Sequence, residues 1–466
     1  MTESWSVPSL AAVSRPSLTV RPQPALGLRE ARDPALDGLR GVAILLVFVF
    51  HYGGGLRAGN PLVRAFGYLT QIGWVGVELF FALSGFLITG ILIRNLHTPH
   101  ALPSFYARRA LRILPLYFAA VFACGVAALV TGATLTALKP LLIYAAFLQN
   151  LPPLVNAALH TPPPLPLHHL WSLAVEEQFY LVWPIALLAA RTPHRQFRLC
   201  LATFALSCLC RFVLFAPHSL PYATAQSFAV FLPVRAGALA LGGALAVHLR
   251  SLPHPHTSIR PAGEPVLPAV PLQTSTTAPS EAKEVPAGST AATRGGRKTL
   301  IAPGPRAANT GSPVTRTLLL LSLIALLTIL LTGRHTRSLL LNNPASFMFT
   351  LPAVDLLSIV LVALSLRPNL FRRFCAVPAL CFLGRISYGI YVLHILLQPL
   401  FDHLGFLLTH ATAGFPYQTA RLLTAFPITV AAAWISFTVF ESPFLRLKDR
   451  FPQKALPLAG SYTSHA

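Results

Sequence analysis

The chain has 466 residues, of which 54% are hydrophobic and only 11% are charged. Soluble domains carry about 25% charged residues, so this composition excludes an ordinary soluble protein and indicates a polytopic membrane protein. The net charge of +22 does not indicate nucleic-acid binding, because the cations flank apolar segments as the positive-inside rule expects and no nucleic-acid-reading motif is present.

Apolar windows predict an all-α fold with about ten transmembrane helices and both termini in the cytoplasm. Residues 1–35 and 448–466 are predicted as cytoplasmic tails, the first of them disordered. A disordered cytoplasmic linker, 251–315, separates the first six helices (36–250) from the last four (316–447). The predicted spans are 36–52, 73–93, 112–131, 170–190, 198–216, 231–249, 317–333, 350–366, 379–401 and 422–441.

The first span carries Arg40 near its inner end and His51 near its outer end. Eleven helical residues make three turns plus about 20°, so both side chains share one face and lie about 16 Å apart along the axis. The alternative is that Arg40 only reaches back to the cytoplasm and His51 only ends the helix. Asp37 is expected to cap this helix.

Carboxylates in two other spans are expected at the depth of His51. Glu78 lies about five residues from the outer end of the second span, and Glu176 and Glu177 lie at a similar depth in the fourth. A carboxylate beside a histidine fixes its tautomer and makes it a better general base. The alternative for each glutamate is an interhelical hydrogen bond.

Two arginines precede the third span. Arg109 and Arg112 are predicted on the first turn of its helix, facing the cytoplasm, where they could bind phosphate oxygens through bidentate bonds. The alternative is ordinary positive-inside charge. The segment 140–150 is too short to cross a bilayer and is predicted to be an interfacial or re-entrant piece on the outer side.

Seven sequence blocks, in order over residues 36 to about 447, resemble the membrane-bound acyltransferase-3 family. The blocks are LDGLRGVAILLVFVFH, GVELFFALSGFLIT, FYARRALRILPLY, HHLWSLAVEEQFYLVWP, FLPVRAGALALGGALA, LGRISYGIYVLH and ESPF. The resemblance implies transfer of an acyl group, commonly acetyl from acetyl-CoA, to hydroxyls of extracytoplasmic or membrane-associated acceptors such as O-antigen, exopolysaccharide or peptidoglycan sugars.

The resemblance also assigns roles to residues. It implies that His51 is the catalytic histidine with Arg40 as its partner, and that Arg109 and Arg112 hold the CoA of the acyl-CoA donor. Glu78 and Glu176 occupy the acidic positions of their blocks. Further residues are predicted either to hold the acceptor or to stabilise the structure: Glu177, Tyr180, Arg211, Arg235, Tyr388 and His394.

For Arg211 and Arg235, holding the acceptor, stabilising an oxyanion and forming a salt bridge to a glutamate all remain open. For His394, packing or hydrogen bonding is favoured over catalysis. Asp355 is an intramembrane acid to which the sequence assigns no role, and no metal site or permanently bound cofactor is expected.

The sequence contains no GDS-like nucleophile block, so we expect no fused SGNH hydrolase domain and either direct transfer or a separate extracytoplasmic acyl-accepting partner. The main hypothesis is an O-acyltransferase of a bacterial inner membrane that modifies a glycan or glycolipid. A transporter or flippase, and an acyltransferase for a lipid or a small metabolite, are the alternatives. The acceptor, the acyl chain and the choice between direct transfer and an acyl-histidine intermediate stay open.

Overall fold

The computed structural model describes residues 33–53, 61–95, 98–134, 138–151, 166–216, 220–251, 313–336 and 342–451. These residues form helices and connecting turns, with no strand among them, which confirms the predicted all-α fold. Most of the predicted N-terminal tail, central linker and C-terminal tail lies outside the described residues, but α1 and α11 begin within the predicted tail and linker, at Pro34 and Pro313.

Nine of the described helical segments are long and apolar enough to cross a membrane, and a bent pair makes up to ten. The long α-helices are α1 (Pro34–Gly53), α3 (Val75–Asn95), α4 (Ala101–Val130), α7 (Trp171–Ala190), α8 (Pro193–Phe215), α10 (Leu232–Ser251), α11 (Pro313–Thr336), α12 (Leu351–Ser365) and α17 (Phe415–Ile435). The shorter α-helices are α2 (Pro61–Thr70), α5 (Lys139–Ala145), α9 (Tyr222–Ser227), α13 (Leu370–Cys375), α14 (Pro378–Arg385), α15 (Ser387–Leu396), α16 (Gln398–Thr409) and α18 (Ser442–Arg446). The 3₁₀ segments are Gln71–Trp74, His168–Leu170 and Leu447–Arg450, and the π-helical segments are Ser346–Thr350 and Ser436–Glu441.

Two helices differ from the predicted spans. The predicted ninth span, 379–401, is not one straight helix, because α14 and α15 meet at Ile386 with a bend of 65°. The helix of the third span begins at Ala101, so Arg109 lies in its third turn and Arg112 in its fourth, and neither lies in its first. Hydropathy missed this early start because the basic first turns of α4 are not apolar enough to register as a span.

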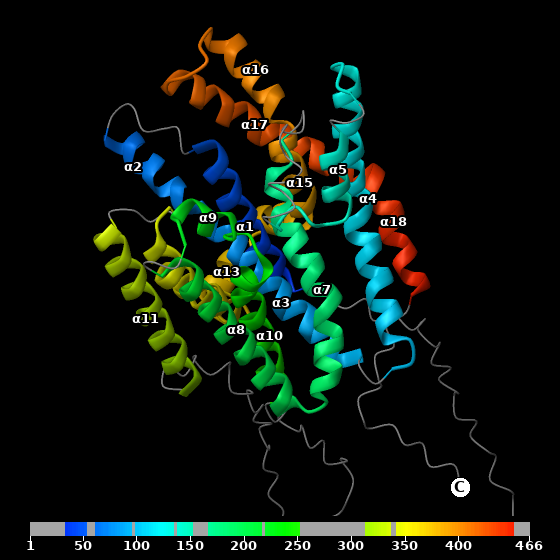
Figure 1. Ribbon diagram of the computed structural model, residues 1–466, viewed down its shortest axis with the longest axis vertical. Helices are drawn as coiled ribbons and strands as arrows, with labels where there is room; N and C mark the ends of the chain where they lie inside the picture. Colours follow the sequence, from blue (N-terminus) through cyan, green and yellow to red (C-terminus); the bar gives the residue numbers. More distant parts are fainter. Residues whose placement is uncertain are drawn as a thin grey trace, which may run out of the picture.

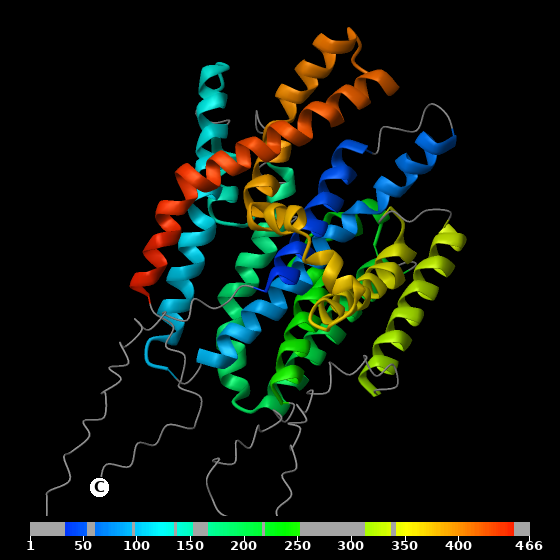
Figure 2. The same ribbon diagram turned by 180° about the vertical axis from the view of Figure 1, so that it is seen from behind.

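Glycines bring two helices of the core, α3 and α10, into very close contact. A Cβ at Gly85 of α3 would lie 1.9 Å from the carbonyl oxygen of Leu239 in α10, and one at Gly242 of α10 would lie 2.1 Å from that of Ala82 in α3. Small residues permit such close backbone approach, which drives helix association in membranes. Figures 1 and 2 show α1, α3 and α10 side by side in the middle of the bundle.

The first helix is fitted against α13 and α14 in the same way. A Cβ at Gly38 would lie 1.5 Å from the carbonyl oxygen of Cys375, and one at Gly41 would lie 2.1 Å from that of Leu380. On the opposite side of this contact, a Cβ at Gly384 of α14 would lie 1.7 Å from the carbonyl oxygen of Asp37. The position of α1 is therefore defined by backbone contact with residues near the other end of the chain.

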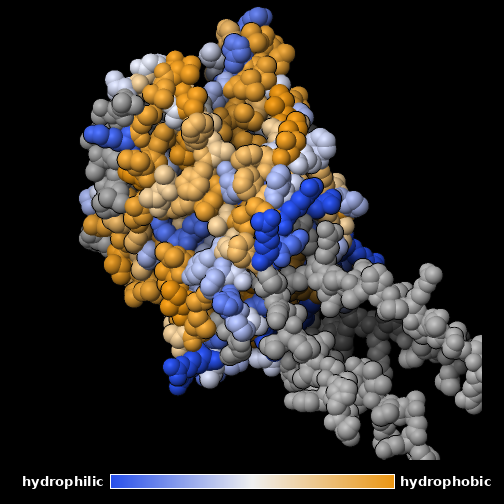
Figure 3. All heavy atoms as spheres, turned by 90° about the vertical axis from the view of Figure 1, so that its right-hand side faces the viewer, coloured by the Kyte–Doolittle hydropathy of each residue, from blue (hydrophilic) through white to orange (hydrophobic). Residues whose placement is uncertain are grey.

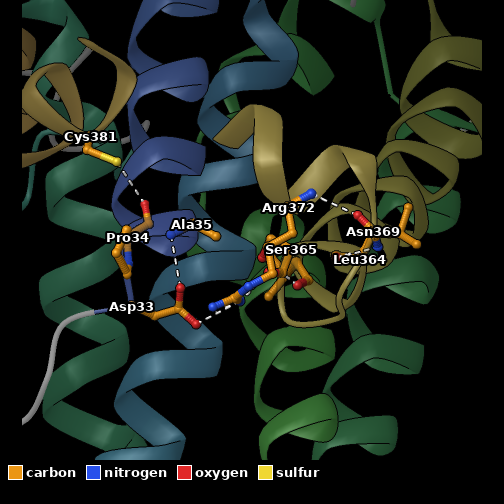
Figure 4. A network of polar contacts seen from close by, with 9 residues as sticks. Asp33, Pro34, Ala35, Leu364, Ser365, Asn369, Arg372 and Cys381 are labelled. Atoms are coloured by element: carbon orange, nitrogen blue, oxygen red, sulfur yellow. Dashed lines mark hydrogen bonds and ion pairs between the residues drawn. The ribbon is translucent and has the colours of Figure 1, made fainter. Parts of the chain in front are cut away.

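A polar network fixes the start of α1 (Figure 4). The Asp33 carboxylate accepts a hydrogen bond from the backbone N–H of Ala35 at 2.9 Å, so Asp33 caps the helix and the expectation for Asp37 was wrong. Asp33 also pairs with Arg372 of α13 at 2.9 Å, and Arg372 donates to the carbonyl of Ser365 at 2.7 Å. Asp37 instead lies 3.5 Å from Arg40.

The outward side of the bundle is apolar, as a lipid-facing surface must be. Figure 3 shows one such face, which is hydrophobic over most of its area. Exposed side chains include Phe122 and Val130 of α4 and Leu181 of α7. The short segment 140–150 lies largely in α5, which packs beside α4 (Figure 1). The Tyr117 hydroxyl of α4 donates a hydrogen bond to the carbonyl of Tyr144 in α5 at 2.7 Å.

Candidate active site

Two cavities lie between the central helices, and the first collects the arginines that the sequence singled out. This arginine cavity has a volume of about 90 Å³. Side chains from α1, α3, α4, α7 and α15 surround it. Its polar lining residues are Arg40, Ser84, Arg109, Arg112, Ser172, Glu176, Tyr180, Ser387, Tyr388 and Tyr391.

The second cavity contains His51 and is also about 90 Å³ in volume. Its lining is largely aromatic, with one arginine, and comes from α1, α3, α7, α10, α15 and the 3₁₀ segments before α3 and α7. The lining residues of this histidine cavity are Val47, Phe50, His51, Trp74, Val77, His169, Trp171, Arg235 and Tyr391.

The two cavities follow one another along the same helices. On α1 the first is lined by Arg40 and the second by Val47, Phe50 and His51, and α7 shows a matching order, with Trp171 at the second cavity and Glu176 at the first. The predicted common face of Arg40 and His51 thus opens onto both cavities.

A chain of polar contacts lines the arginine cavity. The Arg109 guanidinium stacks over the Tyr180 ring with its central carbon 5.0 Å from the ring centre. The Tyr180 hydroxyl lies 2.6 Å from the hydroxyl of Ser84, which donates to Glu176 at 2.7 Å. Because Ser84 gives its proton to the carboxylate, Tyr180 donates to Ser84. Arg109 is therefore held in place by its stacking partner and not by an ion pair with Glu176.

His51 is oriented by a backbone carbonyl and a second histidine. A carbonyl can only accept, so the 2.8 Å contact between His51 Nδ1 and the oxygen of Val47 places the proton on Nδ1. By the same reasoning, His394 Nδ1 donates to the carbonyl of Tyr391 at 2.7 Å, which leaves His394 Nε2 as an acceptor. This Nε2 lies 3.4 Å from His51 Nδ1. His51 Nε2 consequently carries a lone pair and can act as a base.

This geometry corrects the expectation that a glutamate orients His51. Glu78 pairs with Arg235 at 2.5 Å, and Glu176 accepts from Ser84. Glu177 is half-buried and lines neither cavity, and its Oε1 has no hydrogen-bond partner among the described residues. The predicted depth of Glu78 along its helix places it near the level of His51. Its side chain, however, points to Arg235 and not to His51.

A third histidine lies behind His394. His169 Nε2 donates to the carbonyl of Val392 at 3.2 Å, and its ring centre lies 5.2 Å from that of His394. The Tyr52 hydroxyl donates to the carbonyl of His394. Sequence reasoning missed His169, although it stands in the HHLW start of the fourth block.

Two buried ion pairs involve four of the intramembrane charges. Arg235 joins Glu78 and also stacks over Trp171 at 4.9 Å, so it lines the histidine cavity. Arg211 pairs with Asp355 at 2.7 Å with both side chains fully buried, and neither lines a cavity. Of the alternatives for Arg211, the structure therefore favours a salt bridge, although its partner is Asp355 and not a glutamate.

Two tyrosines of α15 complete the site. The Tyr388 hydroxyl donates to the carbonyl of Ile113 at 2.6 Å beside the arginine cavity. The Tyr391 hydroxyl donates to the carbonyl of His169 at 2.7 Å and accepts from Ser172 at 2.5 Å. The sequence did not single out Tyr391, which follows Tyr388 by three residues in the same block.

The bundle and its cavities define a class: a helical integral membrane protein with two neighbouring cavities, one lined by a cluster of arginines and the other by histidines. The chain belongs to the acyltransferase-3 family, whose model, described as an acyltransferase domain, matches residues 33–441. This confirms the resemblance predicted from the seven sequence blocks.

Several curated proteins are similar to part of the chain. Peptidoglycan O-acetyltransferase OatA of Listeria monocytogenes is 27% identical over 203 residues, which cover 40% of this chain and 30% of that protein. YrhL of Bacillus subtilis, provisionally named a peptidoglycan O-acetyltransferase, is 32% identical over 165 residues, covering 33% of this chain and 23% of YrhL. The chain thus matches less than a third of the length of these relatives. No solved structure matches the chain.

Proposed function

We propose that this protein is an integral membrane O-acyltransferase that moves an acetyl group from cytoplasmic acyl-CoA to a hydroxyl of an extracytoplasmic or membrane-associated glycan. The family match and the names of the relatives support an O-acyltransferase over a transporter. The observation that carries the proposal is the pair of cavities, with guanidinium groups at one and a histidine base at the other.

In this proposal the arginine cavity receives the donor. Arg109 and Arg112 bind the phosphates of CoA from the cytoplasm, and Arg40 adds a third positive charge to the same cavity. The pantetheine arm then extends along α1 for about 16 Å, the axial distance between Arg40 and His51. Its thioester reaches the histidine cavity while the phosphates remain at the arginines.

His51 supplies the base. Its Nε2 takes the proton of the acceptor hydroxyl while the hydroxyl oxygen attacks the thioester carbonyl carbon. The tetrahedral intermediate collapses with cleavage of the C–S bond, and the sulfur leaves with the proton from His51, giving the acetyl ester and free CoA. In the alternative route, Nε2 attacks the thioester carbonyl carbon, the C–S bond breaks and CoA leaves as the thiolate. The acceptor hydroxyl then takes the acyl group from the acyl-histidine, its proton goes to the thiolate, and Nε2 is regenerated.

The histidine cavity fits a sugar better than a charged metabolite. Trp74 and Phe50 offer apolar ring surfaces for the C–H faces of a pyranose, and Arg235 offers guanidinium donors for its oxygens. Glu78 neutralises Arg235, so the cavity has no strong net charge of its own. We place the protein in a bacterial cytoplasmic membrane with both termini on the donor side.

The test uses membranes that contain the full chain and radiolabelled acetyl-CoA, with label followed into glycan and lipid fractions. We expect wild-type membranes to label the glycan fraction and His51→Ala to reduce this labelling by about 10²–10⁴-fold, the contribution of a general base. His403→Ala, which removes an exposed histidine of α16, is the matched control.

Three results would contradict the proposal. Equal labelling with wild type and His51→Ala would show that His51 is not the base. Label confined to lipid would replace the glycan acceptor with a lipid. Absence of labelling together with export of unmodified glycan would favour a transporter. Label retained on the protein when no acceptor is present would select the acyl-histidine route.

A further inference from the structure

We propose that the Glu176 carboxylate binds an amide N–H group in the pantetheine arm of the donor, so that the arginine cavity selects donors whose carrier contains an amide. The proposal rests on the function proposed above. It adds a specificity-determining residue to that function, and it concerns the arginine cavity alone.

The hydroxyl groups of the arginine cavity donate their protons to the protein itself. The described hydroxyl groups that line it belong to Ser84, Ser172, Tyr180, Ser387, Tyr388 and Tyr391. Tyr180 donates to Ser84 at 2.6 Å, and Ser84 donates to Glu176 at 2.7 Å. Tyr388 donates to the carbonyl of Ile113 at 2.6 Å.

The remaining three hydroxyl protons are also engaged. Ser172 donates to Tyr391 at 2.5 Å, and Tyr391 donates to the carbonyl of His169 at 2.7 Å. Ser387 donates to the carbonyl of Gly384 at 2.9 Å. A hydroxyl group whose single proton is engaged offers a ligand only lone pairs. These hydroxyl groups can therefore accept a hydrogen bond from a ligand, but they cannot donate one.

The polar lining of the cavity is consequently divided into donors and acceptors. The side-chain donors at this cavity are the guanidinium groups of Arg40, Arg109 and Arg112. Glu176 supplies the strongest acceptor, because hydrogen bonds to an ionised group are about twice as strong as those between neutral groups. A ligand that matches this lining carries both an anionic group and a hydrogen-bond donor.

The Glu176 side chain is placed to receive such a donor. It is half-buried and lines the cavity, so the cavity gives access to it. Its Oε1 accepts from Ser84, and because an ionised carboxylate accepts at both oxygens, Oε2 can accept from a ligand. The guanidinium groups of the same cavity favour the ionised form of Glu176. The bond from Ser84 fixes the carboxylate before a ligand binds.

A CoA thioester has both of the required groups. Its phosphates lie at one end and its amide N–H groups lie along the pantetheine arm, whereas an acyl phosphate is anionic but has no N–H group. The Glu176 carboxylate repels phosphates and so leaves them to the guanidinium groups. Arg109 and Glu176 are joined through Tyr180 and Ser84, and we therefore assign Glu176 to the amide nearer the diphosphate.

The experiment compares acetyl-CoA with an analogue in which an ester oxygen replaces the N–H group of that amide. The two donors have nearly the same shape, but the analogue has lost the hydrogen-bond donor. We measure kcat/KM for acetyl transfer to the acceptor fraction in membranes that contain the full chain. Wild-type protein should prefer acetyl-CoA over the analogue by about tenfold or more, as expected for a hydrogen bond to a charged group.

Glu176→Gln should reduce this preference to about twofold or less. The glutamine keeps an oxygen for Ser84 and turns an NH₂ group toward the cavity, so the acceptor for the amide is lost. Glu177→Gln removes the neighbouring carboxylate, which lines neither cavity, and it should keep the wild-type preference.

Comparing the two donors within one variant cancels differences in folded yield, and Glu176→Ala provides a second measurement if Glu176→Gln is poorly produced. Equal transfer from both donors by the wild type would overturn the role of Glu176, as would an unchanged preference in the Glu176 variants. Either result would leave the proposed function intact. A wild type that transfers from neither donor would overturn the proposed function and the role of Glu176 with it.

Discussion

We expect that removing either member of the buried ion pair between Arg211 and Asp355 destabilises the protein, whereas removing both members together does not. Its Nη1 and Oδ2 atoms lie 2.7 Å apart, and both side chains are fully buried. Removing one partner leaves the other charge buried without its direct ion-pair partner, which costs about 3–5 kcal/mol. We expect Arg211→Met and Asp355→Asn each to lower the free energy of unfolding by about that amount.

The neighbouring hydrogen bonds add little to this cost. Arg211 Nε donates to the carbonyl of Val234 at 2.8 Å, but that carbonyl also accepts from Ser207 at 3.1 Å and keeps this partner in the variant. In the double variant no buried charge remains at this position. Replacing both members of a buried pair is often neutral, so we expect the double variant to recover most of the loss.

Unfolding in mixed micelles, followed by tryptophan fluorescence against the mole fraction of denaturing detergent, measures all four corners of this double-mutant cycle. The expected coupling free energy is about 3 kcal/mol or more. The reasoning is refuted if either single variant unfolds within about 1 kcal/mol of wild type, below the cost of breaking a buried pair. It is also refuted if the losses of the two single variants simply add in the double variant.

Gly85→Ala should reduce the yield of monodisperse protein in detergent, because the new Cβ would lie 1.9 Å from a carbonyl oxygen of α10, whereas Gly90→Ala on the same helix, with its nearest atom at 3.9 Å, should not. A normal yield of the first variant would contradict the close helix contact. His394→Ala should lower kcat for acyl transfer by about tenfold with little effect on KM, a smaller loss than the 10²–10⁴-fold expected for removing the base itself. A change in KM with kcat unchanged would contradict a role for His394 in orienting His51. Arg109→Gln should raise KM for acetyl-CoA by about tenfold or more, because a hydrogen bond to a charged group contributes about 1.5–3 kcal/mol. The control is Arg108→Gln, because the Arg108 guanidinium donates to backbone carbonyls near the C-terminal end of the described chain. An equal rise in KM in the two variants would contradict phosphate binding by Arg109.

Hydropathy predicted the number and order of the spans because the bilayer imposes length and apolarity on every helix that crosses it. It could not predict the bend at Ile386, since no internal proline marks the break. The early start of α4 was missed for the opposite reason. Its first three turns are helical and lead to Arg109, which lines a cavity, and hydropathy does not detect polar turns of this kind.

For the site, sequence periodicity placed Arg40 and His51 on one helix face, and the structure opens that face onto both cavities. The predicted carboxylate partner of His51 was wrong because distance from a helix end gives depth in the membrane but not direction around the helix axis. His394, 343 residues away along the chain, takes that position instead. Only the fold brings these two side chains together.

The role of Asp355 shows the same limit. Its partner Arg211 lies 144 residues earlier in the chain, and no sequence motif links the two residues. The pairing depends on Gly237 of α10, where a Cβ would lie 2.2 Å from the carboxylate. A glycine in an apolar run carries no signal of this kind until the three helices are seen packed.

The glycine-fitted contact between α1 and α14 has a consequence for how the protein is made. Gly41 and Gly384 are about 340 residues apart, so α1 leaves the ribosome long before the helix that fits its surface exists. At about 5–20 residues per second this interval is roughly 17–70 s. During it, the helix that bears Arg40 and His51 waits in the membrane without its final neighbour. Assembly of the site therefore depends on the end of synthesis, and the proposed acyl transfer cannot begin on a partly made chain.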